Sequence, residues 1–565
     1  MRSVRIIIFF LVLLIAAFLS LAARCFYLQF FRNDHYAGLC VRQRLGLMTE
    51  KPQRGVILDC RGRVFAASNE VQTIFAEPRA IGDPQSASRE LAAILNMDAD
   101  VICGLITESG NPGFAVIREA TDRQQCLAAC RIYGIGVQSN WRRQYPMNSL
   151  ASHIVGFTGS DNAGLGGIEL QYDKELRGSA GQNVFFADAF RRPIRMKQQD
   201  SILKDGAGII LTIDATIQQF AQAELAKQYQ SYQAESAVAI VAEPKTGAIL
   251  AMVSLPNFNP NEIQTADPDS LRNQAVTAQF EPGSIIKPVV AAIAIDAGAV
   301  GLNEQIFCEN GNYHGKGFGQ IKEYHYHQFG NLTVREILLE SSNIGMAKIG
   351  QKLGRDRLYN GMKLFGFGKK TGIDIPGEAE GLLRPADKWT GYSVTRIPFG
   401  QEISVTAIQL VQAFCMLANG GYAVRPFLVR AMVGSDGRII KLNQPSPPVG
   451  FVIKPEVAKW IVTEAMVAVI NEGTGKSAKL GKWQVFGKTG TAQLAGSNEQ
   501  GYSERDYIAS FIAGAPAEDP RVIVLVSICK PKVSLGKGYT GGTVAAPVAA
   551  KILEKTLTYL EKHQI

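Results

Sequence analysis

The sequence lacks the paired cysteine spacing that marks a disulfide framework or a zinc site. Nine cysteines stand at positions 25, 40, 60, 103, 126, 130, 308, 415 and 529. The odd count and the apolar surroundings of several of them favour free, buried thiols. Cys308 is followed by His314, His325 and His327. This spacing fits no usual zinc template, and the glycines between these residues favour a hairpin instead.

Internal repeats, long low-complexity runs and a charged tail are also missing. The net charge of +9 is spread along the chain, which favours a mildly basic soluble surface over a nucleic-acid groove. The segment "GTGKS" resembles part of a P-loop, but Ile470 stands where that motif requires glycine. With 565 residues, the chain is too long for one compact domain, and two or three domains are expected.

One long apolar run is present, close to the N-terminus. The residues "IIIFFLVLLIAAFLSLAA" lie between Arg5 and Arg24, and residues 25–28 can extend them. At 1.5 Å per residue this length suits a bilayer core, and it exceeds the apolar core of most cleaved signal peptides. We therefore predict a transmembrane anchor over residues 6–28, after a tail of residues 1–5. Basic residues follow the run as well as precede it, so charge alone leaves the orientation open.

The rest of the chain divides by its patterns into three parts. Residues 29–50 read as a basic juxtamembrane linker, and residues 51–205 as a mixed α+β domain that includes a hairpin at "RGVILDCRGRVFAAS". A strand and a helix near Asp214 and Thr216, either of which could cap that helix, mark entry into a second and larger domain, residues 206–565.

Lys-Thr-Gly occurs three times, starting at Lys245, Lys370 and Lys488. The first copy follows Pro244 between two apolar strands, which predicts a hairpin turn. The second lies among glycines after a helical segment, which predicts a loop. The third follows the apparent strand "KWQVF". Only the third is placed to present its side chains along a strand edge.

Four Ser-x-x-Lys matches exist, and Ser284 with Lys287 is distinguished by its context. Gly283 permits a sharp entry into an apolar helix that extends to about Ala297. Pro288 is tolerated only in the first turn, so the helix must begin at or just before Ser284. Lys287 then lies one turn further on the same face, and burial could lower its pKa enough for it to accept the proton of the serine.

A Ser-x-Asn pair and the third Lys-Thr-Gly complete a candidate site. Ser341 and Asn343 lie between two helical segments, a rigid position from which Ser341 could relay protons and Asn343 could orient Lys287. On the strand, Lys488 supplies a charge for a carboxylate and a second cation near Lys287. Gly490 lets a substrate backbone approach the edge, and the hydroxyls of Thr489 and Thr491 add donors.

These three motifs, in this order, resemble those of penicillin-binding proteins and serine β-lactamases. The segments "RGVILDCRGR" and "GIELQYDKELRG" are similar to the pedestal of class B penicillin-binding proteins, and "FGFGKKTGIDIPGE" and "YTGGTVAAPVAAKIL" to their transpeptidase domain. The implied fold is α+β: a transmembrane helix, a pedestal (dimerisation-type) domain, and an antiparallel sheet flanked by helices. "FEPGSIIKP" and the "GKGYTGG" ending favour the septal, cell-division type over the elongation type.

The resemblance implies a peptidoglycan D,D-transpeptidase that needs no metal or other cofactor. Ser284 would attack the penultimate D-Ala carbonyl of a stem peptide while Lys287 takes the proton. Ser341 would pass a proton to the departing D-Ala, and Lys488, Thr489 and Thr491 would bind the terminal carboxylate. The backbone N–H groups of Ser284 and Thr491 would form the oxyanion hole. An acceptor amine would resolve the acyl-enzyme, and β-lactams would acylate Ser284.

The resemblance also places the chain in the bacterial cytoplasmic membrane, single-pass, with the catalytic domain outside. A membrane glycosyltransferase and division proteins are the implied partners, and nucleic acid is not. The alternatives are a D,D-carboxypeptidase or β-lactamase, which would use water, and a non-catalytic division scaffold. One departure is Glu402, which stands where many relatives carry glycine and is expected to be structural rather than an extra base.

Overall fold

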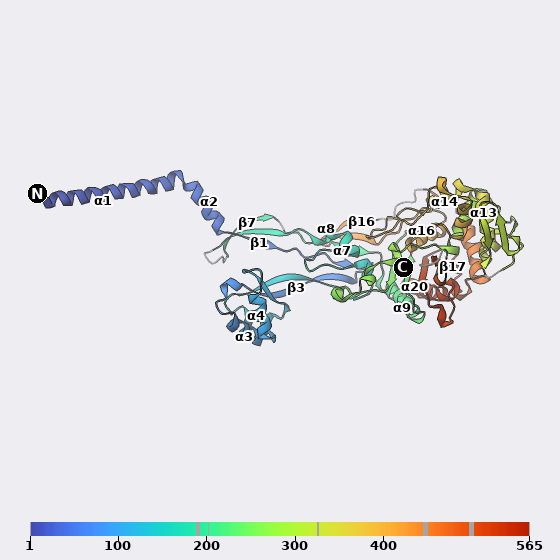
Figure 1. The fold of residues 1–565 in the computed structure, drawn as a ribbon, viewed down its shortest axis with the longest axis horizontal. Coiled ribbons are helices and arrows are strands. Elements are labelled where there is room, and N and C mark those ends of the chain that lie inside the picture. Colours follow the sequence, from blue (N-terminus) through green and yellow to red (C-terminus); the bar gives the residue numbers. More distant parts are fainter. Residues whose placement is uncertain are drawn as a thin grey trace. The chain divides into compact units, whose positions relative to one another are not determined.

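The computed structural model describes residues 2–187, 193–201, 203–324, 327–443, 450–495 and 502–563. His325, one of the histidines considered above, lies outside these ranges. The chain forms two compact units, one made of residues 1–53 and 178–205 and the other of residues 54–177 and 206–565. We describe each unit by itself; the ribbon is drawn in Figure 1.

The first unit contains the apolar helix and a small sheet. The helix α1 (Arg2–Phe26) continues through the π-helical turn η1 (Tyr27–Phe31), and together they are long and apolar enough to cross a membrane. The interval that we predicted as a linker contains α2 (Asn33–Arg44) and β1 (Leu45–Glu50). Strand β1 pairs antiparallel with β6 (Gly181–Ala187), and β6 with β7 (Pro193–Ser201).

In the second unit, the N-terminal part is a mixed α+β region, as predicted. The expected hairpin is formed by β2 (Ile57–Leu58) and β3 (Val64–Ala76), which pair antiparallel. The other elements are α3 (Pro84–Leu95), α4 (Ala99–Thr107), β4 (Ala115–Thr121), α5 (Arg123–Ala129), β5 (Ile135–Gln144), α6 (Ser152–Val155), α7 (Gly167–Gln171) and α8 (Asp173–Arg177). Residues from α3, α4 and α5 pack with β3 and β4 into one apolar core.

An ionic cluster links the turn between β2 and β3 to the start of a later helix, which begins at Ala215. Arg63 contacts the carboxylates of Asp59 and Asp214, each at 2.6 Å. Asp214 is also the N-cap of α9 (Ala215–Ser231), because its side chain accepts the N–H of Thr216 at 2.8 Å. Of the two N-cap candidates, Asp214 is therefore the one that the structure uses.

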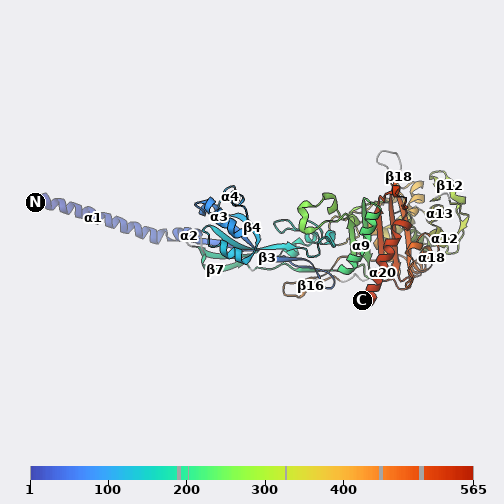
Figure 2. The same ribbon diagram turned by 90° about the horizontal axis from the view of Figure 1, so that it is seen from below.

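A five-stranded antiparallel sheet forms the centre of the second unit, in the order β10-β9-β19-β18-β17. Its strands are β9 (Ser236–Ala242), β10 (Ile249–Leu255), β17 (Phe486–Ala495), β18 (Tyr502–Ala515) and β19 (Val522–Cys529). One apolar cluster joins β9 and β19 to α9 and α20 (Ala546–Lys562), and Figure 2 shows these two helices beside the sheet. Strand β17 is an edge strand, so one of its sides is open to a ligand.

A larger apolar cluster joins the sheet to a group of helices. This group contains the 3-10 turn η5 (Gly283–Ile286), α11 (Lys287–Asp296), α12 (Val334–Glu340), α13 (Asn343–Leu353), α14 (Arg355–Leu364) and α16 (Ala407–Ala418). All twelve residues of α16 are buried, and Thr406 with Gln409 forms a capping box at its start. The predicted glycine-rich hairpin is present as β12 (Asn312–Gly315) and β13 (Gly319–Lys322).

The first two Lys-Thr-Gly copies are structural, as predicted. The copy at Lys245 is the turn between the antiparallel strands β9 and β10, and Gly247 has a φ of 82°. The copy at Lys370 lies in the loop after α14, where Glu378 accepts the N–H of Thr371 at 2.6 Å. Neither copy lines the pocket described below.

Candidate active site

Ser284 lies on a 3-10 turn that leads directly into α11. We predicted a helix from Ser284 onward; the structure starts with the tighter turn η5, and α11 begins at Lys287. Gly283 has a φ of 54°, in the left-handed region that other residues rarely adopt. Pro288 lies in the first turn of α11, where a missing N–H leaves no bond unmade. Ser284 remains partly exposed while Lys287 is fully buried.

The amine of Lys287 is held by the Ser-x-Asn segment. It donates to Ser341 Oγ at 3.2 Å and to Asn343 Oδ1 at 2.9 Å, and also to the backbone oxygen of Ser341. Burial lowers the pKa of Lys287 to about 7, and the negative charge of Glu323 opposes this shift. Among the described residues, Ser284 is not a hydrogen-bond partner of this amine, although the two residues are one turn apart.

The Ser-x-Asn residues occupy the junction between α12 and α13. Ser341 ends α12 in a left-handed conformation, with a φ of 58°. Ser342 is the N-cap of α13, and its hydroxyl accepts the N–H of Gly345 at 2.9 Å. Because two helices fix the backbone on either side, Ser341 and Asn343 are rigidly placed toward Lys287, as the sequence predicted.

Sequence reasoning missed Glu323, which follows β13. Its carboxylate accepts the N–H of Asn343 at 2.7 Å and the N–H of Ile344 at 3.2 Å, and the Ser342 hydroxyl donates to it as well. The residue is buried. A local pattern could not reveal this contact, since Glu323 lies twenty positions before Asn343. A carboxylate here satisfies N–H groups that the start of a helix leaves without partners.

Lys488 reaches the same centre from the edge strand β17. The residue is fully buried, and its amine donates to Ser341 Oγ at 3.0 Å. We expected Lys488 to present a charge directly to a carboxylate. Instead Thr489 and Thr491 line the pocket, and Lys488 lies behind Ser341. The amine also donates to the Thr489 backbone oxygen at 3.4 Å and to Thr489 Oγ1 at 3.5 Å, so Lys488 can act on a ligand through Ser341, through Thr489 or through space.

The two lysines share one acceptor, so their charges oppose each other. Burial holds the pKa of Lys488 well below its usual value, and the neighbouring Lys287 lowers it further. Both amines are buried and contact the same hydroxyl oxygen. The state in which both are protonated is therefore strongly disfavoured. The pair thus loses a proton near neutral pH, and one amine is then available as a base.

Gly490 is needed for packing against the nucleophile turn. A Cβ at this position would lie 2.7 Å from Ile285 Cγ1 and 3.1 Å from the Pro282 oxygen. The expectation was that Gly490 leaves room for a substrate backbone. The structure supplies a second reason, because only glycine lets β17 approach η5 this closely. The strand thereby brings the Thr491 backbone next to the turn that carries Ser284.

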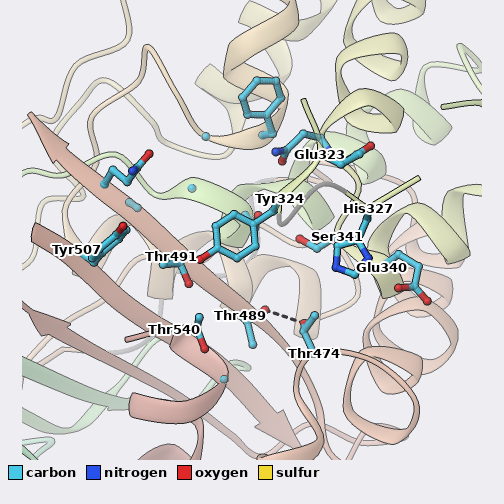
Figure 3. A pocket seen from close by; sticks show the side chains of 18 of the residues that line it. Glu323, Tyr324, His327, Glu340, Ser341, Thr474, Thr489, Thr491, Tyr507 and Thr540 are labelled. Atoms are coloured by element: carbon cyan, nitrogen blue, oxygen red, sulfur yellow. Dashed lines mark hydrogen bonds between the residues drawn. The ribbon is translucent and has the colours of Figure 1, made fainter. Parts of the chain in front are cut away.

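A pocket of about 490 Å³ opens over these residues. Of the predicted residues, Ser284, Ser341, Asn343, Thr489 and Thr491 line it. Residues that the sequence did not indicate are also present: Glu281, Tyr324, His327, Glu340, Gln401, Thr474, Tyr507 and Thr540. Figure 3 shows Tyr324 between Ser341 and Thr491, and the hydrogen bond of 2.8 Å that joins Thr474 to Thr489.

The site is that of a serine acyl-transfer enzyme, and two family matches agree with it. Residues 49–211 match the family described as "Penicillin-binding Protein dimerisation domain". Residues 237–554 match "Penicillin binding protein transpeptidase domain". The chain therefore belongs to the class B penicillin-binding proteins, in which these two domains follow one another.

Curated relatives extend over nearly the whole chain. Stage V sporulation protein D of Bacillus subtilis is 33% identical over 98% of this chain and 85% of its own length. The probable peptidoglycan D,D-transpeptidase PenA of Neisseria meningitidis is 31% identical, with 98% and 92% covered. The peptidoglycan D,D-transpeptidase FtsI of Escherichia coli is 30% identical, with 88% and 82% covered. The enzyme is accordingly a peptidoglycan D,D-transpeptidase.

Solved structures share the fold. A peptidoglycan synthetase from Bifidobacterium adolescentis superposes with a TM-score of 0.74 at 25% identity, covering 92% of this chain and 97% of that one. Penicillin binding protein 3 of the tuberculosis mycobacterium, complexed with aztreonam, gives a TM-score of 0.70 at 25% identity, with 92% and 98% covered. The predicted α+β architecture, an apolar helix followed by dimerisation and transpeptidase domains, is confirmed.

Proposed function

We propose that this transpeptidase works through an acyl-enzyme on Ser284 and cross-links stem peptides during septal wall synthesis. The observation that carries the proposal is the convergence of Lys287, Ser341 and Lys488 beside the partly exposed Ser284. An amine with a pKa of about 7 is well matched to proton transfer at neutral pH.

In the proposed acylation, Ser284 Oγ bonds to the penultimate D-Ala carbonyl carbon as Lys287 takes its proton. The backbone N–H groups of Ser284 and Thr491 stabilise the oxyanion. The C–N bond to the terminal D-Ala then breaks, and Ser341 passes a proton from Lys287 to the departing amine. An acceptor amine on a second stem peptide attacks the ester, and its surplus proton returns along the same path, which regenerates Ser284.

We assign the substrate contacts to groups at the pocket. Thr489 and Thr491 present hydroxyls to the terminal carboxylate, with Gly490 between them on β17. The buried Lys488 acts behind them: a bound carboxylate stabilises its protonated form, which in turn favours the neutral form of Lys287. Asn343 orients Lys287 and hydrogen-bonds a substrate amide. No metal or nucleotide enters this scheme.

A fluorescent penicillin tests the acyl-enzyme. The wild type should be labelled and Ser284→Ala should not, while Ser160→Ala, in another Ser-x-Asn match, should be labelled normally. Labelling of Ser284→Ala would exclude Ser284 as the nucleophile. A stem-peptide donor with and without an acceptor amine separates transfer from hydrolysis. Hydrolysis alone with every amine would replace the transpeptidase assignment by a carboxypeptidase.

We further propose a single-pass protein of the bacterial cytoplasmic membrane, with α1 as anchor, the catalytic domain outside, and a membrane glycosyltransferase and division proteins as partners. The septal role is supported by the similarity to FtsI and to Stage V sporulation protein D at about one third identity. A tagged copy should concentrate at midcell. Uniform sidewall localisation would favour the elongation type.

A further inference from the structure

We propose that Glu323 is a positioning residue of this active site: its buried carboxylate fixes the start of α13 and faces the amine of Lys287 with a negative charge. Three groups at the start of α13 contact this carboxylate, the N–H of Asn343 at 2.7 Å, the N–H of Ile344 at 3.2 Å and the hydroxyl of Ser342. The proposal rests on the proposed role of Lys287 as the base.

One residue, Asn343, links Glu323 to the amine of Lys287. The backbone of Asn343 is held by Glu323, and the side-chain oxygen of the same residue accepts from Lys287 at 2.9 Å. The side-chain N–H of Asn343 also donates to the Lys322 oxygen at 3.3 Å, next to Glu323 in sequence. The last residue of β13 and the residue after it therefore hold both the side chain and the backbone of Asn343.

The carboxylate is built into the protein rather than solvated at its surface. Glu323 is 5% exposed and Ser342 is fully buried. Ser342 also contacts the buried thiol of Cys308 at 3.6 Å. A carboxylate with little water and three donors has one fixed orientation, and its charge acts strongly at short range.

Three influences act on Lys287 within this centre. Burial favours loss of its proton, and Lys488, from β17, which shares Ser341 Oγ, adds repulsion whenever its own amine is protonated. Glu323, from the segment after β13, favours its retention. Glu281 and Glu340 line the same pocket. The balance between burial and Glu323 sets the pKa of this amine at about 7. Without Glu323, Lys287 would be neutral over a wider pH range but would bind a proton more weakly.

The test is the pH dependence of penicillin acylation by the full-length, detergent-solubilised enzyme. Glu323→Gln keeps the size and an acceptor oxygen but removes the charge. We expect the midpoint of the rising limb to move to lower pH by about one unit, and the rate on the plateau to fall about 10-fold. Glu336→Gln is the matched control, because Glu336 caps α12 through Thr333 without contacting Lys287.

A merely structural role predicts a different result. Both variants would then lose thermal stability, and neither would move the pH midpoint. An unmoved midpoint in folded Glu323→Gln overturns the proposal. If Glu323→Gln does not fold, Glu323→Asp is measured: its shorter carboxylate keeps the charge, so the rate should fall at least 3-fold with the midpoint retained. A wild-type rate in Glu323→Asp, or failure of Glu323→Asp as well as Glu323→Gln to fold, would also count against a role in positioning.

Ser284-dependent labelling of the wild type separates this proposal from the proposed function. If the wild type is labelled and Ser284→Ala is not, the acyl-enzyme stands, and the Glu323 variants judge the positioning role alone. If the wild type is not labelled through Ser284, the proposed function fails before Glu323 is examined.

Discussion

Lys287 and Lys488 donate to the same atom, Ser341 Oγ, at 3.2 Å and 3.0 Å. The lysines come from α11 and from the edge strand β17, and both are fully buried. Two buried amines on one oxygen cannot both keep their protons without a large free-energy cost. The hydroxyl of Ser341 is also the acceptor through which a proton can pass between them. This arrangement gives the proposed mechanism its pH dependence.

Removing the charge of Lys488 should raise the pKa of Lys287. In Lys488→Met the repulsion between the two amines is absent, so Lys287 keeps its proton to higher pH. The rising limb of acylation against pH, expected near 7 in the wild type, should move to higher pH. The rate should also fall by roughly 10- to 100-fold. The measurement is the rate of labelling by fluorescent penicillin between pH 5.5 and about 9.5.

A lysine from another Lys-Thr-Gly copy, Lys245, provides the control for this variant. Lys245 belongs to the hairpin turn and is paired with Asp519 at 2.6 Å, with more than half of its side chain exposed. Lys245→Met should leave both the rate and the midpoint unchanged. A midpoint that falls in Lys488→Met would show that the repulsion between the two amines does not set the pKa of Lys287.

The buried amine of Lys287 should make the folded protein less stable at lower pH. Its pKa is about 7 in the folded state, below the ordinary lysine value that the unfolded chain retains. Between these values the unfolded state binds more protons, so the free energy of unfolding rises with pH. Below about pH 7 both states are protonated and the full penalty remains.

Lys287→Met lacks this titration. Relative to the wild type, it should be more stable at pH 6, and the difference should shrink steadily toward pH 10. Urea denaturation of both proteins at several pH values, with Lys245→Met as reference, measures the difference. A difference that stays constant with pH would contradict the lowered pKa of Lys287.

Gly490 should not tolerate a side chain unless its neighbour shrinks. In Gly490→Ala the new Cβ meets Ile285 Cγ1 at 2.7 Å, which pushes the turn that carries Ser284 away from β17. Acylation should fall by about 10-fold or more, because small displacements of reacting groups reduce rates steeply. The double variant with Ile285→Ala should recover part of the rate. Gly481→Ala, where no atom lies within 4 Å, should behave as the wild type.

The sequence predicted the parts of this site that depend on local spacing. The members of each pair, Ser284 with Lys287, Ser341 with Asn343, and Lys488 with Thr491, are at most three positions apart, so a short pattern identifies them. Contacts between distant segments were not predictable in this way. The carboxylate of Glu323 meets α13 only because β13 ends beside it. The burial of Lys488 and the approach of Gly490 to Ile285 likewise depend on how β17 packs against η5.

The fold shows the same difference between local features, which the sequence predicted, and contacts between distant segments, which it did not. Apolar strands, capping residues and the turn at Lys245 predicted the hairpins and helices of the second unit, and these predictions are confirmed. The pairing of β1 with β6 joins residues 131 to 141 positions apart, from Glu50 with Gly181 to Leu45 with Phe186. The sequence around β1 is short and basic and carries no turn signal, which is why it read as a linker.

Glu402 offers a test of backbone strain beside the site. Its φ is 60°, so this non-glycine residue occupies a left-handed conformation, which glycine adopts at lower cost. The carboxylate accepts the Ser393 hydroxyl at 2.6 Å and lies 3.8 Å from Arg384. Glu402→Ala loses these contacts and keeps the strain, so it should lower the free energy of unfolding by about 1 kcal/mol.

Glu402→Gly loses the same contacts but relieves the strain, which is worth about 1 kcal/mol. Its stability should therefore lie within about 0.5 kcal/mol of the wild type, and above that of Glu402→Ala. Both variants should be labelled by penicillin at the wild-type rate, because they keep the backbone N–H of residue 402, which donates to the Glu281 carboxylate at 2.9 Å. Thermal denaturation and labelling kinetics measure the two effects separately. A large loss of labelling in folded Glu402→Gly would mean that the carboxylate takes part in the reaction.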